Sequence, residues 1–286
     1  MNRTKLLIRT LIFFVAGIAL LMPVLGVSKG KTMYAEQVAV LMYHHIYNED
    51  ESSGTITTDL FEEQLVYLRE RGYTFISLQQ FLAFMEGAAV PDNAVLVTFD
   101  DGYESVYANA YPILTRMGIP AANFIITNKH DNPREHTPTF MTPDEIRTMT
   151  TAKPGIISAQ CHTEGMHDNP DAPFMVTRLP TPDGGKETEE QYRQRIVSDT
   201  RACIQRLTPL GPEKVNTLAY PYGVYDKISS ELLREAGIEY AFTIVPEMAT
   251  RSVNKMQIPR INAGSPHISP EVLHQTIRRR IETVIR

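Results

Sequence analysis

The chain has 286 residues, no tryptophan, two cysteines and a net charge of −5 at pH 7. This length suits one large domain with a full core and does not by itself require two. The acidic balance argues against nucleic-acid binding, and any aromatic platform for a ligand must be built from tyrosine or phenylalanine.

The N-terminal segment is typical of an export signal. Three basic residues precede residues 10–28, an uncharged and mostly apolar run that just reaches the length needed to cross a bilayer. No clear cleavage site comes after it, so we expect residues 1–35 to be a signal anchor, with a cleaved signal peptide as the alternative and a buried core helix as the least favoured interpretation. Residues 36–286 would then form one domain outside the cytoplasm.

From residue 36 onward, strands and helices alternate. The first expected elements are strand 38–42, helix 58–71 with Asp59 and Glu62 spaced as a capping box, strand 75–76, helix 77–86, strand 94–99, helix 105–117 and strand 123–126. A helix beginning at Thr142 comes next, then strand 156–160, loop 168–186, helix 187–207, strand 217–220, helix 228–236, strands 240–245 and 257–262, and a last helix from Ser269. This order predicts an α/β fold with a parallel sheet, closed as a barrel.

Two strand ends carry residues that suit a metal site. Asp100 and Asp101 follow strand 94–99, and His162 and His167 follow strand 156–160. Adjacent carboxylates at a strand end point in different directions, so one can face a metal while the other reaches the water beside it. The histidines converge only if their segment is a loop. One carboxylate and two imidazoles suit zinc or a similar divalent ion, and the pattern predicts metal-assisted hydrolysis.

These motifs carry a resemblance to a known family. Residues 98–102 (TFDDG), 162–167 (HTEGMH) and 219–223 (AYPYG) resemble, in order, the first three motifs of the NodB-homology polysaccharide deacetylases, carbohydrate esterase family 4. The resemblance covers about residues 37–265 and implies a distorted (β/α)7 barrel that removes N-acetyl groups from a sugar polymer.

The family pattern implies a role for each matching residue. Asp100 would be the general base, and Asp101, His162 and His167 would hold Zn²⁺, or Co²⁺ or Ni²⁺ in its place. The main-chain N–H of Tyr222 would stabilise the oxyanion, a role that needs the turn rather than the phenol.

Departures from the pattern point to one branch. The five-residue histidine spacing and the segment 41–45 (LMYHH) resemble the deacetylases of poly-β-1,6-N-acetylglucosamine from biofilms. In that branch the general acid comes first in the chain, so we expect His44 to be the acid, with His45 as the alternative and a purely structural His-His pair as a third interpretation. Arg260 either replaces the family arginine by pairing with Asp100 or forms a solvent-exposed salt bridge.

Other residues receive simpler interpretations. Cys161 and Cys203 are expected to be free, buried thiols. His130, His136 and His267 are expected in solvent, and His274 on the surface of the last helix. Tyr103 either lines the substrate groove or simply packs.

The sequence therefore predicts an exported, monomeric, membrane-attached N-deacetylase of an N-acetylglucosamine-containing polysaccharide. Its preferred substrate would be poly-β-1,6-N-acetylglucosamine. The alternatives are a peptidoglycan or chitooligosaccharide deacetylase, an O-acetyl esterase and, least favoured, a non-catalytic sugar-binding barrel.

Overall fold

The computed structural model describes residues 31–50 and 52–282. From Thr32 on, the described residues belong to a single compact unit. The apolar run predicted to be an anchor lies outside the described residues. Among the helices of the described part, none is both long and apolar enough to cross a membrane.

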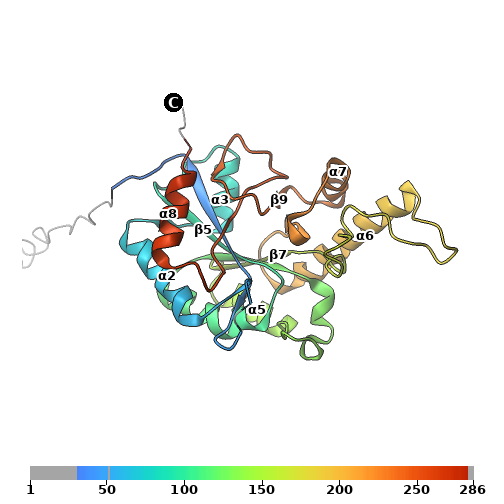
Figure 1. Cartoon of the computed structure of the whole chain (residues 1–286), viewed down its shortest axis with the longest axis horizontal. Helices are drawn as coiled ribbons and strands as arrows, with labels where there is room; N and C mark the ends of the chain where they lie inside the picture. Colours follow the sequence, from blue (N-terminus) through green and yellow to red (C-terminus); the bar gives the residue numbers. More distant parts are fainter. Residues whose placement is uncertain (1–30, 51, 283–286) are drawn as a thin grey trace, which may run out of the picture. The chain divides into compact units, whose positions relative to one another are not determined.

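Strands and helices alternate along the compact unit, as the sequence predicts (Figure 1). The strands are β1 (Gln37–Tyr43), β2 (His45–Ile46), β3 (Thr55–Ile56), β4 (Thr74–Phe75), β5 (Ala94–Phe99), β6 (Ala121–Ile125), β7 (Ile157–Cys161), β8 (Thr217–Ala219), β9 (Tyr240–Phe242), β10 (Ala249–Thr250) and β11 (Ile261–Asn262). The α-helices are α2 (Thr58–Glu70), α3 (Leu78–Met85), α4 (Tyr111–Met117), α5 (Pro143–Ala152), α6 (Glu189–Leu207), α7 (Lys227–Ala236) and α8 (Pro270–Arg280).

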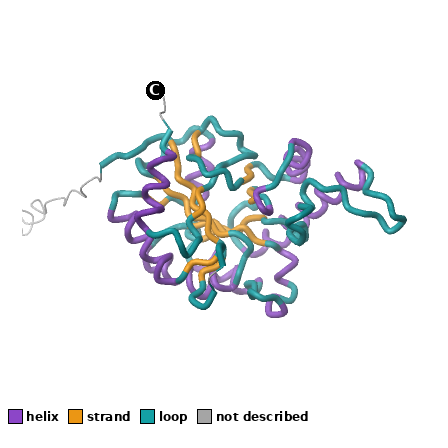
Figure 2. Tube along the Cα trace, in the orientation of Figure 1, coloured by secondary structure: helices purple, strands orange, loops and turns teal. Residues whose placement is uncertain are grey.

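One sheet forms the centre of this unit, and helices surround it (Figure 2). Its strand order is β10-β1-β5-β6-β7-β8-β9, with β11 also pairing with β1 and β4 with β5. Every residue of β1 and β5 is buried, because both faces of these parallel strands are covered. The parallel strands β5, β7 and β8 all end on the same edge, where the predicted site residues follow them.

The sheet is a curled, mixed half-barrel rather than the closed parallel barrel that we expected. In the described part, β10 runs antiparallel to β1, and no continuous ladder joins β9 back to β1. The expected strand 257–262 is broken because Pro259 lacks an N–H for a ladder. Ile258 makes an isolated bridge to Phe242, and only β11 pairs with β1. Arg260 lies between these two contacts.

Several local boundaries also differ from the expectation. Helix α2 is capped by Thr57, whose hydroxyl accepts from the Leu60 N–H, so the predicted Asp59–Glu62 capping box is wrong. The helix expected at 105–117 begins with a π-helical segment, Val106–Ala110, ahead of Pro112, whose missing N–H removes one helical hydrogen bond. The capping boxes at Ser77 and Thr142 form as their spacing suggests.

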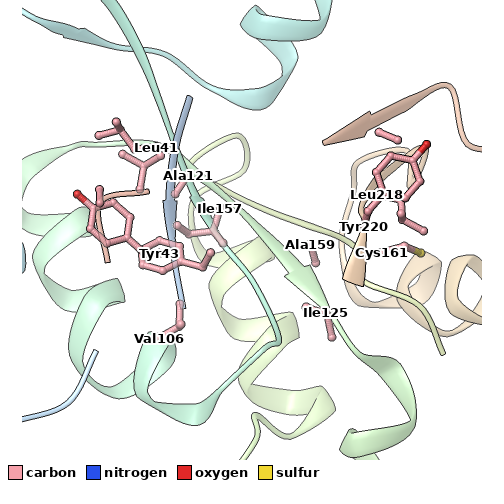
Figure 3. Packing of buried hydrophobic residues seen from close by; sticks show 14 of the residues in the cluster. Leu41, Tyr43, Val106, Ala121, Ile125, Ile157, Ala159, Cys161, Leu218 and Tyr220 are labelled. Atoms are coloured by element: carbon pink, nitrogen blue, oxygen red, sulfur yellow. The ribbon is translucent and has the colours of Figure 1, made fainter. Parts of the chain in front are cut away.

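The core lies on both sides of the sheet. Figure 3 shows buried side chains of one core cluster from several strands, among them Leu41, Ile125 and Leu218, and Val106 from the π-helical segment. Cys161 at the end of β7 and Cys203 on α6 are both buried and free, which confirms the prediction. Burial raises the pKa of the Cys161 thiol well above its ordinary value, so this thiol is protonated and packs as an apolar group.

Candidate metal centre and active site

The two aspartates after β5 are buried and point in different directions, as predicted. The backbone of Asp101 has φ 73°, in the left-handed region that non-glycine residues rarely adopt. This reversal directs the Asp101 carboxylate toward the end of β7 and leaves Asp100 facing Arg260. Backbone strain of this kind persists where the surrounding structure enforces it, and it recurs at functional sites.

Asp101, His162 and His167 converge on one point. Nε2 of His162 and Nε2 of His167 each lie 3.3 Å from Oδ1 of Asp101. The three candidate ligand atoms lie within 4.8 Å of one another. Oδ1 of Asp101 is buried and has no hydrogen-bond partner. A buried carboxylate oxygen facing two imidazole nitrogens is a donor set that suits a divalent metal ion.

Electrostatics act on all three side chains. Burial would lower the pKa of His162, but the contact with Asp101 and the charges of both aspartates raise it above its ordinary value. Burial alone would raise the pKa of Asp101, but the contact with His162 and the charge of the nearby histidines hold it far below its ordinary value. Burial, together with the charge of His162, lowers the pKa of His167 to about 4, so this imidazole is neutral at pH 7. The Ala219 carbonyl lies 2.7 Å from Nδ1 of His162, which places the proton on Nδ1 and the lone pair on Nε2.

The segment between the two histidines is a loop fixed at several points. Thr163 has φ 78°. Asp199 of α6 accepts hydrogen bonds from the main-chain N–H groups of Glu164 (2.9 Å) and Gly165 (2.7 Å). The carboxylate of Glu164 also pairs with Arg206 of α6 at 3.0 Å. Helix α6 thus holds the turn that lets two histidines five residues apart face one metal. Asp199 could not be predicted from the sequence, because nothing in its helical context distinguishes it from a solvated aspartate.

Arg260 pairs with Asp100 and is fully buried, so the first of its two predicted roles is the one observed. Its Nη1 and Nη2 lie 2.6 and 2.7 Å from the two carboxylate oxygens. Its Nε donates to the Thr243 carbonyl, which fixes the guanidinium plane. Burial is the largest single influence and would raise the pKa of Asp100, but the charge and hydrogen bonds of Arg260, together with the charges of His162 and His44, outweigh it and hold this pKa below its ordinary value. Asp100 is therefore ionised at neutral pH.

The two adjacent histidines after β1 have different surroundings. His44 is partly exposed, and its Nε2 lies 3.8 Å from Oδ2 of Asp100. His45 is buried; its Nδ1 lies 2.7 Å from the Ser105 hydroxyl and its ring stacks on Tyr47. His44 therefore faces the aspartate pair, whereas His45 is held by packing.

Tyr222 lies in the turn after β8, with φ 57° in the left-handed region. Its ring lies 4.6 Å from that of His167, and its hydroxyl donates to the main-chain carbonyl of His167 at 2.5 Å. The sequence predicted a role for the main-chain N–H of this turn and none for the phenol. The structure adds that the phenol connects the third motif to a candidate metal ligand.

Two histidines predicted to be solvated are buried. His130 is 6% exposed, because it packs under Gly102, and its Nδ1 donates to the Met141 carbonyl. His274 is 9% exposed and its Nδ1 lies 2.8 Å from the Tyr73 hydroxyl. Both predictions are wrong for one reason: the burial comes from segments that the local sequence pattern does not include. His267 is exposed, as expected.

Comparison with known proteins identifies the chain's relatives. Residues 87–241, more than half of the chain, match the family model described as polysaccharide deacetylase. A protein of Staphylococcus aureus strain COL named poly-β-1,6-N-acetyl-D-glucosamine N-deacetylase is 27% identical over 252 residues, which cover 82% of this chain and 81% of the relative. A Staphylococcus epidermidis protein of the same name is 26% identical over 208 residues, 72% of this chain and 67% of the relative.

Solved structures show the same fold. The match to a structure of IcaB from Ammonifex degensii has a TM-score of 0.67 and 26% identity, and covers 84% of this chain and 97% of that one. A de-N-acetylase from Aggregatibacter actinomycetemcomitans matches with a TM-score of 0.74 and 21% identity, over 84% of this chain and all of the other. The half-barrel described above is therefore a fold that deacetylase structures share.

Proposed function

Because this chain belongs to the polysaccharide deacetylase family, we propose that it is a metal-dependent N-deacetylase of poly-β-1,6-N-acetylglucosamine that works outside the cytoplasm. The observation that carries the proposal is the buried Asp101–His162–His167 cluster, with the Asp100–Arg260 pair beside it. The choice of polymer is supported by the names of the relatives that cover most of the chain, and the location by the apolar N-terminal run.

Asp101, His162 and His167 would hold the ion, which we propose to be Zn²⁺. The unpartnered Asp101 oxygen and the free Nε2 lone pair of His162 fit this group. Bound there, a divalent ion supplies Lewis-acid chemistry to the amide carbonyl and the attacking water.

The remaining residues would perform the proton transfers. Asp100, kept ionised by Arg260, would accept the proton of the attacking water. His44, which faces Asp100 and is open to solvent on one side, would protonate the leaving amine nitrogen. The main-chain N–H of Tyr222 would donate to the developing oxyanion. The products are acetate and a glucosamine unit with a cationic amine.

The test is acetate release from β-1,6- and β-1,4-linked N-acetylglucosamine oligomers by protein stripped of metal and then reloaded with Zn²⁺, Co²⁺ or Ni²⁺. We expect release to require metal and to favour the β-1,6 linkage. Asp100→Asn should lower kcat at least about 100-fold, and Asp92→Asn, an exposed aspartate, should not.

Three results would contradict parts of the proposal. A β-1,4 preference would move the substrate toward chitooligosaccharides or peptidoglycan. Release only from O-acetylated sugars would identify an esterase. No release by protein shown to hold zinc would leave a sugar-binding protein.

A further inference from the structure

Two cavities join beside the candidate active site. The smaller, of about 240 Å³, is lined by His44, Asp101 and Tyr103 among others. The larger, of about 690 Å³, lies farther from the aspartates, and its size is in the range of ligand-binding pockets. Both are lined by His45, Asp50 and Pro138, so the two cavities adjoin and together extend away from the site. A polymer that reacts at one sugar unit needs room for the next unit along such a path.

The larger cavity offers a flat aromatic surface. The Tyr47 ring is 40% exposed and stacks on His45, with ring centroids 5.1 Å apart and planes 28° apart. A hydrogen bond between Nδ1 of His45 and the Ser105 hydroxyl fixes the His45 ring, on which the Tyr47 ring stacks. An aromatic face with a fixed orientation suits the apolar C–H face of a pyranose ring.

Asp50 places a fixed negative charge where the two cavities meet. Its carboxylate accepts hydrogen bonds from the Ser52 N–H (2.9 Å), the Ser52 hydroxyl (3.0 Å) and the Thr55 hydroxyl (2.7 Å). In the described part of the chain, no lysine or arginine forms an ion pair with it, and the hydrogen bonds from Thr55 and Ser52 hold its pKa below the ordinary value. By contrast, Glu104 in the same cavity already pairs with Arg134. Asp50 is thus the carboxylate in this path that remains available to a cation from outside.

We propose that the larger cavity binds the sugar unit next to the reacting one, and that Asp50 pairs with the free ammonium group of that unit when it has already lost its acetyl group. This inference rests on the proposed function, because each N-deacetylation leaves one cationic amine on the polymer. The enzyme would then work preferentially beside units that it has already deacetylated.

The experiment compares trisaccharides whose reacting unit is N-acetylglucosamine and whose neighbour carries either an acetamide or a free amine, with the amine on either side. For the wild type we expect kcat/KM to be about two- to fivefold higher for one amine-bearing isomer, the size of a partly exposed ion pair. This ratio should approach one in Asp50→Asn and at high ionic strength. Asp92→Asn removes the same charge from an exposed position that lines neither cavity and should keep the wild-type ratio.

Calorimetric binding of the same oligomers keeps the inference testable if none of them is a substrate. Tighter binding of one amine-bearing isomer by wild type and not by Asp50→Asn would support it. Equal use or equal binding of all isomers by the wild type would overturn it, as would a preference that persists in Asp50→Asn or at high salt. Absence of acetate release from every oligomer, with the binding preference present, would count against the proposed activity and leave the cation site standing.

Discussion

Arg260 shows how a single buried side chain sets the state of the site. Its guanidinium is 0% exposed and is bound by Asp100, by Thr98 and by the Thr243 carbonyl. A buried ion pair contributes little net stability, because both ions lose their hydration, but removing one partner leaves an uncompensated charge in the interior. The pair therefore stabilises the charged state of Asp100 more than it stabilises the fold.

Arg260→Met should destabilise the protein by about 3 to 5 kcal/mol, because Asp100 then remains buried without a cation. The double variant with Asp100→Asn should lose less than the sum of the two single variants. Urea unfolding of all four proteins measures this coupling. Arg116→Met, which breaks an ion pair with Glu62 at an exposed position, should cost no more than about 1 kcal/mol. Equal costs for the two arginines would contradict the argument.

The free energy of unfolding should depend on pH through His130, and the direction of its pKa shift gives the sign of this dependence. Burial lowers its pKa to about 4, below the value of about 6.5 expected in the unfolded chain. The folded state therefore binds fewer protons than the unfolded state between these values. Its contribution to stability is complete above pH 6.5 and is lost as the pH falls toward 4.

His130→Gln should remove this dependence, since the amide keeps a donor for the Met141 carbonyl and does not titrate. The free energy of unfolding of the wild type should fall, relative to this variant, by about 2 to 3 kcal/mol between pH 7 and pH 4. Unfolding curves at both pH values measure it. His267→Gln, at an exposed position, serves as the control and should track the wild type at both. A constant difference between wild type and His130→Gln would show that His130 titrates normally.

At the scale of the element, helix α6 acts on the site through the loop between the two histidines. Asp199 binds two consecutive N–H groups of this loop, and Arg206 pairs with Glu164 one residue away. Arg195, on the same helix, pairs with Glu187 and donates to the carbonyls of Phe174 and Thr177, so it holds the following loop as well. One helix therefore fixes both segments that flank His167.

Asp199→Asn should weaken metal binding about 10- to 100-fold, the usual cost of losing a group that orients metal ligands. The reason is that an amide has one acceptor oxygen, so one of the two N–H groups faces the amide NH₂ instead. Competition with a chromogenic chelator measures the affinity directly, without relying on activity. Ser198→Ala, one position earlier and exposed, is the matched control. Unchanged affinity in Asp199→Asn would show that the loop keeps its shape without this contact.

For the whole molecule, the ends of β5, β7 and β8 meet at one edge of a curled sheet, so a metal ion there would connect distant parts of the chain. Binding to the folded state alone raises its stability by mass action. The gain is about 2.7 kcal/mol when free metal is 100 times the Kd.

Chelation should accordingly lower the Tm, and added Zn²⁺ should restore it. In His162→Asn the Tm should no longer respond to zinc, whereas His267→Asn should respond as the wild type does. Differential scanning calorimetry with and without chelator makes this comparison. A zinc response that survives in His162→Asn would place the bound metal elsewhere.

The order of elements, and the sheet edge at which the candidate site residues gather, could be predicted from the sequence alone. Apolar runs bounded by capping residues specify strands and helices locally, and parallel strands deliver the residues after them to one edge. That is why both aspartates and both histidines could be placed at one edge from their positions, whereas the choice of Asp101 over Asp100 as metal ligand came from the family resemblance. It also identified Arg260 as a candidate partner of Asp100.

Features that depend on how segments pack together could not be predicted from the sequence and are seen only in the tertiary structure. The strand expected to close the barrel is interrupted at Pro259, which has no N–H to join a ladder, and β10 runs antiparallel beside β1. Three further features arise from segments that meet only in the folded chain. They are the burial of His130 and His274, the hydrogen bonds from the histidine loop to Asp199, and the cavities beside Asp50. Local patterns describe a residue's own neighbours along the chain, whereas burial and charge pairing depend on which segments pack against it.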